Sequence, residues 1–279
     1  MRAYDLAIQN FSVAEHLLQL HELFRGLHES KAEEPLRLAV CTCFDIPEKS
    51  ILRHARNDQV VLVAKATAPI PPSLLVEDGI NFLLRQAVVV GCTALESFFW
   101  DALRENVLTI VRARKRRADE SLRKITLTLD DYLSLEGWGN SDERLQQIIL
   151  KNYERGTLYD SSSIEDIAKI LTVKDFWSQI SSKTGNPDKN IKRHIGEIIQ
   201  RRNQIAHRAD RPDETATTHD EQDGHGLRAI NYAWANTRVA TAKNVVSASA
   251  EIFTDALQQL EDQLAREDEQ RLARQTMKQ

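Results

Sequence analysis

Hydrophobic residues recur at helical spacing along most of the chain. Residues 3 to about 29 carry leucine and phenylalanine in this pattern, which predicts an N-terminal helix or helix pair. Pro47 fits the first turn of a second helix that runs through Ile51 and Val61. The prolines of 66–72 end that helix, because proline has no backbone donor and pushes the preceding residue out of the helical region.

The longest helix-compatible stretch, 73–117, predicts a central helix. Its core stripe consists of Val88, Cys92, Leu95, Phe99 and Leu103. Residues 118–186 contain short amphipathic pieces and predict a helical insertion. The helical pattern returns in 189–210, and after a polar loop at about 209–226 a long helix begins at Leu227.

The composition fits a soluble protein rich in helix. The 279 residues are 42% hydrophobic and 28% charged, and they include only 10 glycines and 7 prolines, which favours long helices over many tight turns. We therefore expect an all-α protein in three parts. An N-terminal helical extension occupies 1–72, a helical domain with an insertion at about 118–186 occupies 73–260, and a charged C-terminal tail occupies 261–279.

Charge and apolar segments narrow the choice of partners. The formal net charge of -4 gives no overall attraction for nucleic acid, so RNA binding has to come from a local patch. Charges interrupt the longest apolar stretches before bilayer length, and the N-terminus lacks the pattern of a signal peptide. We expect a cytoplasmic protein without a membrane partner. Cys41, Cys43 and Cys92 fit reduced thiols and do not complete a zinc site.

An arginine interrupts the apolar stripe of 189–210. The apolar positions of this segment are Ile191, Ile195, Ile198, Ile199, Ile205, Ala206 and Ala209. Arg202 lies three residues after Ile199 and three before Ile205, so it shares their helical face. A buried guanidinium is costly unless a carboxylate or phosphate satisfies its donors.

A glutamate occupies the matching position on the central helix. Glu96 lies four residues after Cys92 and three before Phe99, within the core stripe. Because paired charges are tolerated where a single one is not, we expect Glu96 and Arg202 to meet. Two interpretations remain open: the pair positions the guanidinium for chemistry, or it only fixes the register of two helices.

A second, polar face of 189–210 carries Asn203 and His207, which are four residues apart. Gly196 and Gln200 continue this face toward the start of the helix. His207 lies about 140° around the helix from Arg202. A face that begins with the smallest residue suits close approach of a second copy of the helix, which would bring two histidines and two arginines into one cleft. On the structural alternative, His207 only interacts with the helix dipole.

The hexamer RNQIAH (202–207) resembles the R-N-x-x-x-H signature of the HEPN superfamily. Its flanks are similar to the RiboL-PSP-type branch, because ALESFFWDAL (94–103) resembles the early core helix of that branch, with Glu96 at its polar position. The resemblance covers roughly 75–115 and 189–260. It implies a HEPN-type helical bundle, dimers that build a composite active site and, as in many members, endoribonuclease activity without a metal.

The chemistry of RNA cleavage suits these side chains. RNA carries its own nucleophile, the 2′-hydroxyl, so cleavage needs a base, a cation for the phosphate and an acid for the 5′-oxygen. Imidazole titrates near neutral pH and guanidinium keeps its charge, so we assign proton transfer to His207 and the phosphate to Arg202. Asn203 orients His207 or the phosphate, and Glu96 orients Arg202. The expected products are 2′,3′-cyclic phosphate and 5′-hydroxyl ends, with no metal or other cofactor.

Further cations are candidates for RNA-backbone binding. They are Arg201 and Arg208 beside the motif, and Arg112, Arg114, Lys115, Arg116 and Arg117 at the end of the central helix. The alternative for the second group is a solvated helix terminus, where cations favour the dipole.

The polar loop after the motif has its own chemistry. It contains four candidate metal ligands, His219, Asp220, Asp223 and His225. Acidic loops of this composition are usually only solvated, so no metal is expected. The loop could also cover the cleft that two copies of the motif helix would form. In the following helix, Trp234 is expected in core or dimer packing.

The resemblance also implies a biological role. It points to a toxin of a toxin–antitoxin pair or an antiviral defence effector, a homodimer that cuts RNA, with tRNA among the candidate substrates. A cognate antitoxin or a trigger-sensing partner would control it. Two other functions stay open: a HEPN-fold protein that binds a nucleotide, RNA or partner protein without cleaving, and an inert helical scaffold.

Overall fold

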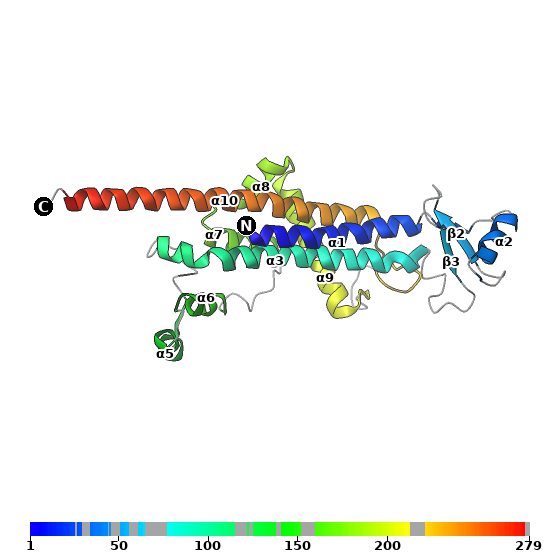
Figure 1. Cartoon of the computed structure of the whole chain (residues 1–279), viewed down its shortest axis with the longest axis horizontal. Helices are drawn as coiled ribbons and strands as arrows, with labels where there is room; N and C mark the ends of the chain where they lie inside the picture. Colours follow the sequence, from blue (N-terminus) through cyan, green and yellow to red (C-terminus); the bar gives the residue numbers. More distant parts are fainter. Residues whose placement is uncertain are drawn as a thin grey trace. The chain divides into compact units, whose positions relative to one another are not determined.

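The described part of the chain is built mainly of helices (Figure 1). The computed structural model describes residues 1–25, 27–29, 34–43, 45, 51–55, 61–64, 77–114, 122, 125–137, 141–151, 160–212 and 221–276. The helices are α1 (Arg2–Arg25), α2 (Glu34–Cys43), the short 3-10 helix η2 (Glu77–Ile80), α3 (Asn81–Arg114), α5 (Leu129–Gly137), α6 (Ser141–Lys151), α7 (Ser161–Ile170), α8 (Phe176–Thr184), α9 (Asp188–Arg208) and α10 (Tyr232–Thr276). The predicted all-α class is confirmed, apart from one small sheet.

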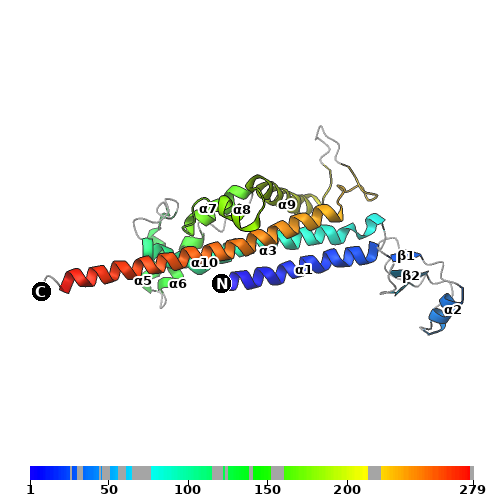
Figure 2. The same ribbon diagram turned by 90° about the horizontal axis from the view of Figure 1, so that it is seen from above.

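That sheet lies where the sequence pattern predicts the second helix. It consists of β1 (Leu27–Glu29), β2 (Ile51–Ala55) and β3 (Val61–Ala64), antiparallel in the order β1-β2-β3. The helix predicted through Ile51 and Val61 is therefore wrong, because Ile51 pairs with Ala64 and Val61 with His54. β-Branched residues lose side-chain freedom in a helix and fit a pleated strand. The N-terminal extension thus combines α1, α2 and this sheet (Figure 2), and the prolines of 66–72 lie outside the described residues.

The chain divides into two compact units, each built from segments that are distant in the sequence. Unit 1 comprises Met1–Phe11, Gly91–Gln200 and Ala240–Gln279, and unit 2 comprises Ser12–Val90 and Arg201–Val239. The part boundaries expected from the sequence, at 72 and 260, stay a prediction.

An aromatic cluster forms the core of unit 1. Phe253 of α10 stacks on Phe98 and Phe176, with ring centroids 6.1 and 6.0 Å away. It also meets the edge of Phe99 at 6.0 Å. All four rings are buried, and each such pair adds about 0.5–1.5 kcal/mol to the stability gained from burial. The predicted core stripe of the central helix, which includes Phe99 and Leu95, is confirmed as buried.

The described part of the predicted insertion at 118–186 is mainly helical. Its second half contains α7 and α8, which lie beside α10 in both views (Figures 1 and 2). The buried side chains here include Ile164 of α7 and Phe176 and Trp177 of α8. The ring of Phe176 packs edge-on against Phe99 of α3, with the ring centroids 6.0 Å apart. These helices are therefore part of the hydrophobic core of unit 1.

One helix among the described residues, Asp78–Arg114, is long and apolar enough to cross a membrane by length and composition. The expectation that charges interrupt the longest apolar stretches before bilayer length therefore does not hold for this helix. Its most apolar window is 61% buried inside the protein, as in the core helix of a water-soluble protein.

Candidate active site at the end of α9

The sequence motif occupies the last turns of α9. Earlier in the helix, four isoleucines are buried at Ile191, Ile195, Ile198 and Ile199. Beyond them the apolar stripe opens to solvent, because Ile205 is half-buried and Ala206 is exposed. Arg202 is half-buried as well. The guanidinium therefore lies at the edge of the apolar stripe, which corrects the fully buried position that the spacing predicts.

The two other motif residues differ in exposure. Asn203 is half-buried, whereas His207 is exposed in the final turn of the helix. An exposed imidazole at a helix end is accessible to a substrate and exchanges protons readily with water or a reacting group. This placement meets the first geometric requirement of a general base or acid.

The chain leaves α9 through two left-handed residues. Ala209 and Asp210 have φ angles of 48° and 60°. Each costs about 1–2 kcal/mol because neither is glycine. The Asp210 amide donates to the Gln204 carbonyl at 3.1 Å, and the Asp210 carbonyl accepts from the Arg228 amide at 2.9 Å. Strained turns of this kind persist where the surroundings fix them, and they are frequent at functional sites.

A buried ionic cluster fixes this turn. Asp210 is 1% exposed and accepts from Arg85 Nε at 2.6 Å and from Arg201 Nη2 at 2.9 Å. The Arg85 Nη2 atom also donates to Asp223 at 2.6 Å. Two guanidinium groups and two carboxylates thus balance each other within unit 2. The cluster joins α3, the end of α9 and the loop before α10.

Burial and hydrogen bonds shift the pKa of two members of the cluster. Burial lowers the pKa of the Arg201 guanidinium, although the Asp210 carboxylate opposes this effect. Burial alone raises the pKa of Asp223, but hydrogen bonds from Arg85 and from the amides of Leu227 and His225 outweigh it. The pKa of the Asp223 carboxyl is therefore below its usual range, which keeps it negatively charged at neutral pH.

The remaining predicted RNA-binding cations have varied placements. Arg208 is exposed in the last turn of α9, and Arg114 is half-buried at the end of α3. Arg112 pairs with Asp142 of α6. Three further predicted cations, Lys115, Arg116 and Arg117, lie outside the described residues. RNA binding by this group, and by Arg201, stays a prediction.

The predicted Glu96–Arg202 pair also stays a prediction. Glu96 is half-buried on α3 within unit 1, whereas Arg202 belongs to unit 2.

Sequence reasoning missed the ionic cluster, although one signal was available. Arg85 stands in the apolar run NFLLRQAVVV (81–90), between Leu84 and Ala87, which are both fully buried. A charge in such a run indicates a buried partner, by the same argument that applies to Arg202. Its partners, Asp210 and Asp223, lie in a polar loop, and nothing in the sequence pattern distinguishes them from solvated acids.

The loop of candidate metal ligands has a structural use. Asp223 binds Arg85, and its other oxygen accepts from the amides of His225 and Leu227 at 2.9 and 3.0 Å. His219 and Asp220 lie outside the described residues. Within the part of the chain that is described, no group of three or more histidine, cysteine, aspartate or glutamate residues is placed to hold a metal ion.

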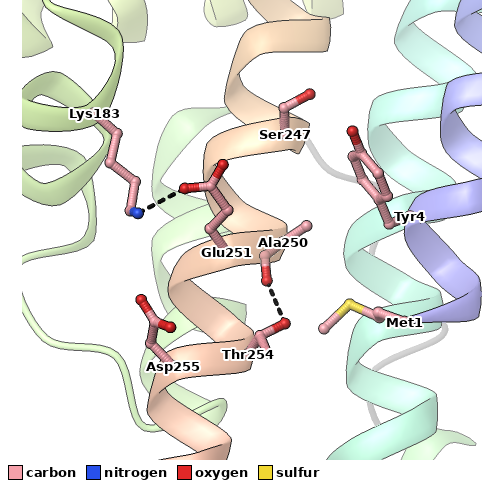
Figure 3. A pocket seen from close by; sticks show the side chains of 8 residues that line it. All are labelled: Met1, Tyr4, Lys183, Ser247, Ala250, Glu251, Thr254 and Asp255. Carbon is pink, nitrogen blue, oxygen red and sulfur yellow. Dashed lines mark hydrogen bonds and ion pairs between the residues drawn. The ribbon is translucent and has the colours of Figure 1, made fainter.

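A groove of about 600 Å³ opens in unit 1 (Figure 3). Its lining consists of Met1, Tyr4, Lys183, Ser247, Ala250, Glu251, Thr254 and Asp255. Lys183 Nζ lies 2.7 Å from Glu251 Oε2. The carboxylates of Glu251 and Asp255 also line the groove, so it has no excess of positive charge to attract an RNA backbone.

Comparison with known proteins adds one match. Residues 60–223 match the family model described as RiboL-PSP-HEPN. The matched range contains α3, the helices of the insertion and α9, together with the hexamer at 202–207. It thus extends across 118–186, which the sequence resemblance leaves out. No curated protein and no solved structure matches the chain.

Proposed function

Because the chain belongs to the RiboL-PSP-HEPN family, we propose that it is an endoribonuclease that cleaves RNA without a metal. The family match covers more than half of the chain, and the described helices form a bundle of the HEPN type. The observation that most supports cleavage is the end of α9. There Arg202, Asn203 and His207 fall within two turns, and His207 is exposed.

The proposed reaction uses the 2′-hydroxyl of the RNA. His207 accepts the proton of that hydroxyl while its oxygen attacks the adjacent phosphorus, and the bond from phosphorus to the 5′-oxygen breaks. Arg202 stabilises the negative charge that develops on the phosphoryl oxygens. Asn203 orients His207 or the phosphate, and Glu96 orients Arg202. The products are a 2′,3′-cyclic phosphate and a 5′-hydroxyl.

A second copy of the chain completes the site in this proposal. One imidazole cannot remove the 2′-hydroxyl proton and protonate the leaving 5′-oxygen in the same step. Because His207 is exposed at the helix end, a symmetric dimer that crosses two α9 helices near their ends brings two such imidazoles to one phosphate. One copy then supplies the base and the other the acid.

The biological role is part of the same proposal. An enzyme of this family fits the role of a toxin or antiviral effector that acts on cytoplasmic RNA. Its candidate substrates include tRNA. An antitoxin or a trigger-sensing partner would restrain it. The exposure of His207 supports such control, because a partner that covers the end of α9 blocks access to this side chain.

The test is a cleavage assay with the full chain, total RNA and tRNA in the presence of EDTA. We expect the wild type to cut and His207→Ala to lose about 10²–10⁴-fold in rate. Arg202→Ala is expected to lose about 10²–10³-fold. Matched controls are His225→Ala, an exposed histidine of the loop, and Arg104→Ala, an exposed arginine that pairs with Asp101 on its own helix. Both controls are expected to cut at the wild-type rate.

The alternative, binding without cleavage, gives a different outcome. The wild type then leaves every RNA intact, while His207→Ala and Arg202→Ala weaken its affinity for RNA, a nucleotide or a partner protein. If neither substitution changes cleavage or binding, the motif is structural and both functions are wrong.

A further inference from the structure

Arg85 joins three segments of unit 2. Its Nε atom donates to Asp210, which follows α9, at 2.6 Å. Its Nη2 atom donates to Asp223 of the loop at 2.6 Å and to the carbonyl oxygen of Arg228 at 2.9 Å. The side chain of Arg85 is only 9% exposed, and those of Asp210 and Asp223 are 1% and 2% exposed. One buried guanidinium therefore connects α3, the turn after the motif and the loop before α10.

Only an arginine fits these contacts. The planar guanidinium presents donors in a fixed fork, so separate nitrogens reach the two carboxylates at the same time. A lysine keeps the charge but concentrates it at one atom on a flexible stem. Because burying a salt bridge costs about as much desolvation free energy as the pairing returns, stability alone is a weak reason for such a cluster. The fixed geometry that the cluster imposes on the three segments is a better reason.

The contact with Asp210 acts on the turn that carries His207. Asp210 lies three residues after His207, in a left-handed conformation that is unfavourable without support. Its amide reaches back to the carbonyl of Gln204 and so spans the last turn of α9. Helix ends fray when their backbone groups are not held. Holding the Asp210 carboxylate therefore holds the turn on which His207 stands.

We propose that Arg85 is a positioning residue for the reaction at His207. It acts through Asp210 and the loop around Asp223, and it does not contact the RNA. This inference rests on the proposed endoribonuclease function. It adds a requirement that the motif itself does not contain: an arginine on α3, far from the motif in the sequence, sets the orientation of the reacting imidazole.

The test compares Arg85→Lys and Arg85→Ala with the wild type in the full chain, at a temperature where each is folded. We expect kcat to fall by about 10–100-fold while KM stays within about threefold, because a displacement of about 1 Å is enough to cause such a loss. Millimolar guanidinium should restore part of the activity of Arg85→Ala by filling the vacated site. It should not restore His207→Ala. Arg104→Lys, on the exposed side of α3, is the matched control.

Hydrogen exchange provides a second measurement that does not depend on cleavage. We expect the amides of 205–211 to exchange faster in Arg85→Lys, while those of α8 in unit 1 keep their rates. Wild-type kcat in folded Arg85→Lys, or a raised KM with unchanged kcat, contradicts the positioning role and leaves the proposed function intact. If the wild type does not cleave RNA, the proposed function fails, and unchanged exchange at 205–211 then also overturns the positioning role.

Discussion

Arg201 Nη2 lies 2.9 Å from Asp210 Oδ2, so the first arginine of the segment RRNQIAHR is held by the carboxylate that follows the helix. The same nitrogen donates to the carbonyl oxygens of Arg228 and Ala229 at 2.9 and 3.2 Å. The adjacent Arg201 and Arg202 thus have different environments. Arg201 holds the turn after α9, and Arg202 is the one proposed to bind phosphate.

Replacing Arg201 with methionine should therefore reduce stability. The substitution removes a charged donor from a buried carboxylate and from two carbonyl oxygens, while Arg85 still balances part of the Asp210 charge. We expect the free energy of unfolding to fall by about 1–3 kcal/mol, measured by chemical denaturation. Arg104→Met, at an exposed ion pair within one helix turn, is expected to change it by less than about 0.5 kcal/mol. If Arg201→Met and Arg104→Met lower the free energy of unfolding equally, Arg201 does not stabilise the turn after α9.

Ala209→Gly should stabilise the protein. Ala209 has a φ of 48°, and glycine adopts this conformation without the steric cost that alanine incurs. We expect the free energy of unfolding to rise by about 0.5–1 kcal/mol. Ala206→Gly is the matched control, because Ala206 is exposed within the helix, where glycine costs about 0.5–1 kcal/mol. A loss of stability at both positions argues against the left-handed turn.

The periodic signal predicted the helices well and failed where it was short. The stripe from Val88 to Leu103 has many repeats, and all its members are buried as predicted. Around Ile51 and Val61 each apolar run has only a few residues, and a few residues fit a helix or a strand equally. The pairing of β2 with β3 decides between them, and neither run alone encodes this pairing.

The candidate site was predictable only in part. The spacing of Asn203 and His207 placed them on one helical face, but the same reasoning put Arg202 within the buried stripe, whereas it is half-buried at the edge of that stripe. The support of the turn was not predictable, because Asp210 and Asp223 acquire their roles from a distant arginine, Arg85. A loop carboxylate has no periodic neighbours that reveal its burial, so its partner becomes visible only in the folded chain.

Acidic conditions should weaken unit 2 through His21. Burial lowers the pKa of this imidazole, and the hydrogen bond with Asn81 and the nearby Glu22 only partly oppose the shift. Its ring also stacks on Tyr232. In the unfolded chain histidine titrates near pH ~6.5. The stabilising contribution of neutral His21 is therefore complete above that pH and decreases as the pH falls toward the lower pKa of the folded state.

The measurement is the free energy of unfolding at about pH 7.5 and about pH 5.5, on either side of the ordinary histidine pKa. We expect His21→Leu to lose less stability between these conditions than the wild type does. His225→Leu, at an exposed position, should show the wild-type difference. If His21→Leu and the wild type lose the same amount, the buried imidazole is not responsible.

The central claim is attack by the 2′-hydroxyl of RNA, assisted by His207. It is tested most directly with an end-labelled RNA that is cut at a known position, compared with the same RNA carrying a single 2′-O-methyl group on the nucleotide 5′ to the scissile phosphate. The account predicts a 2′,3′-cyclic phosphate at the cut in the unmodified RNA and no cut at that position in the modified one. Cleavage of the modified RNA at the same phosphate, with a 3′-hydroxyl or a 5′-phosphate at the new ends, contradicts it.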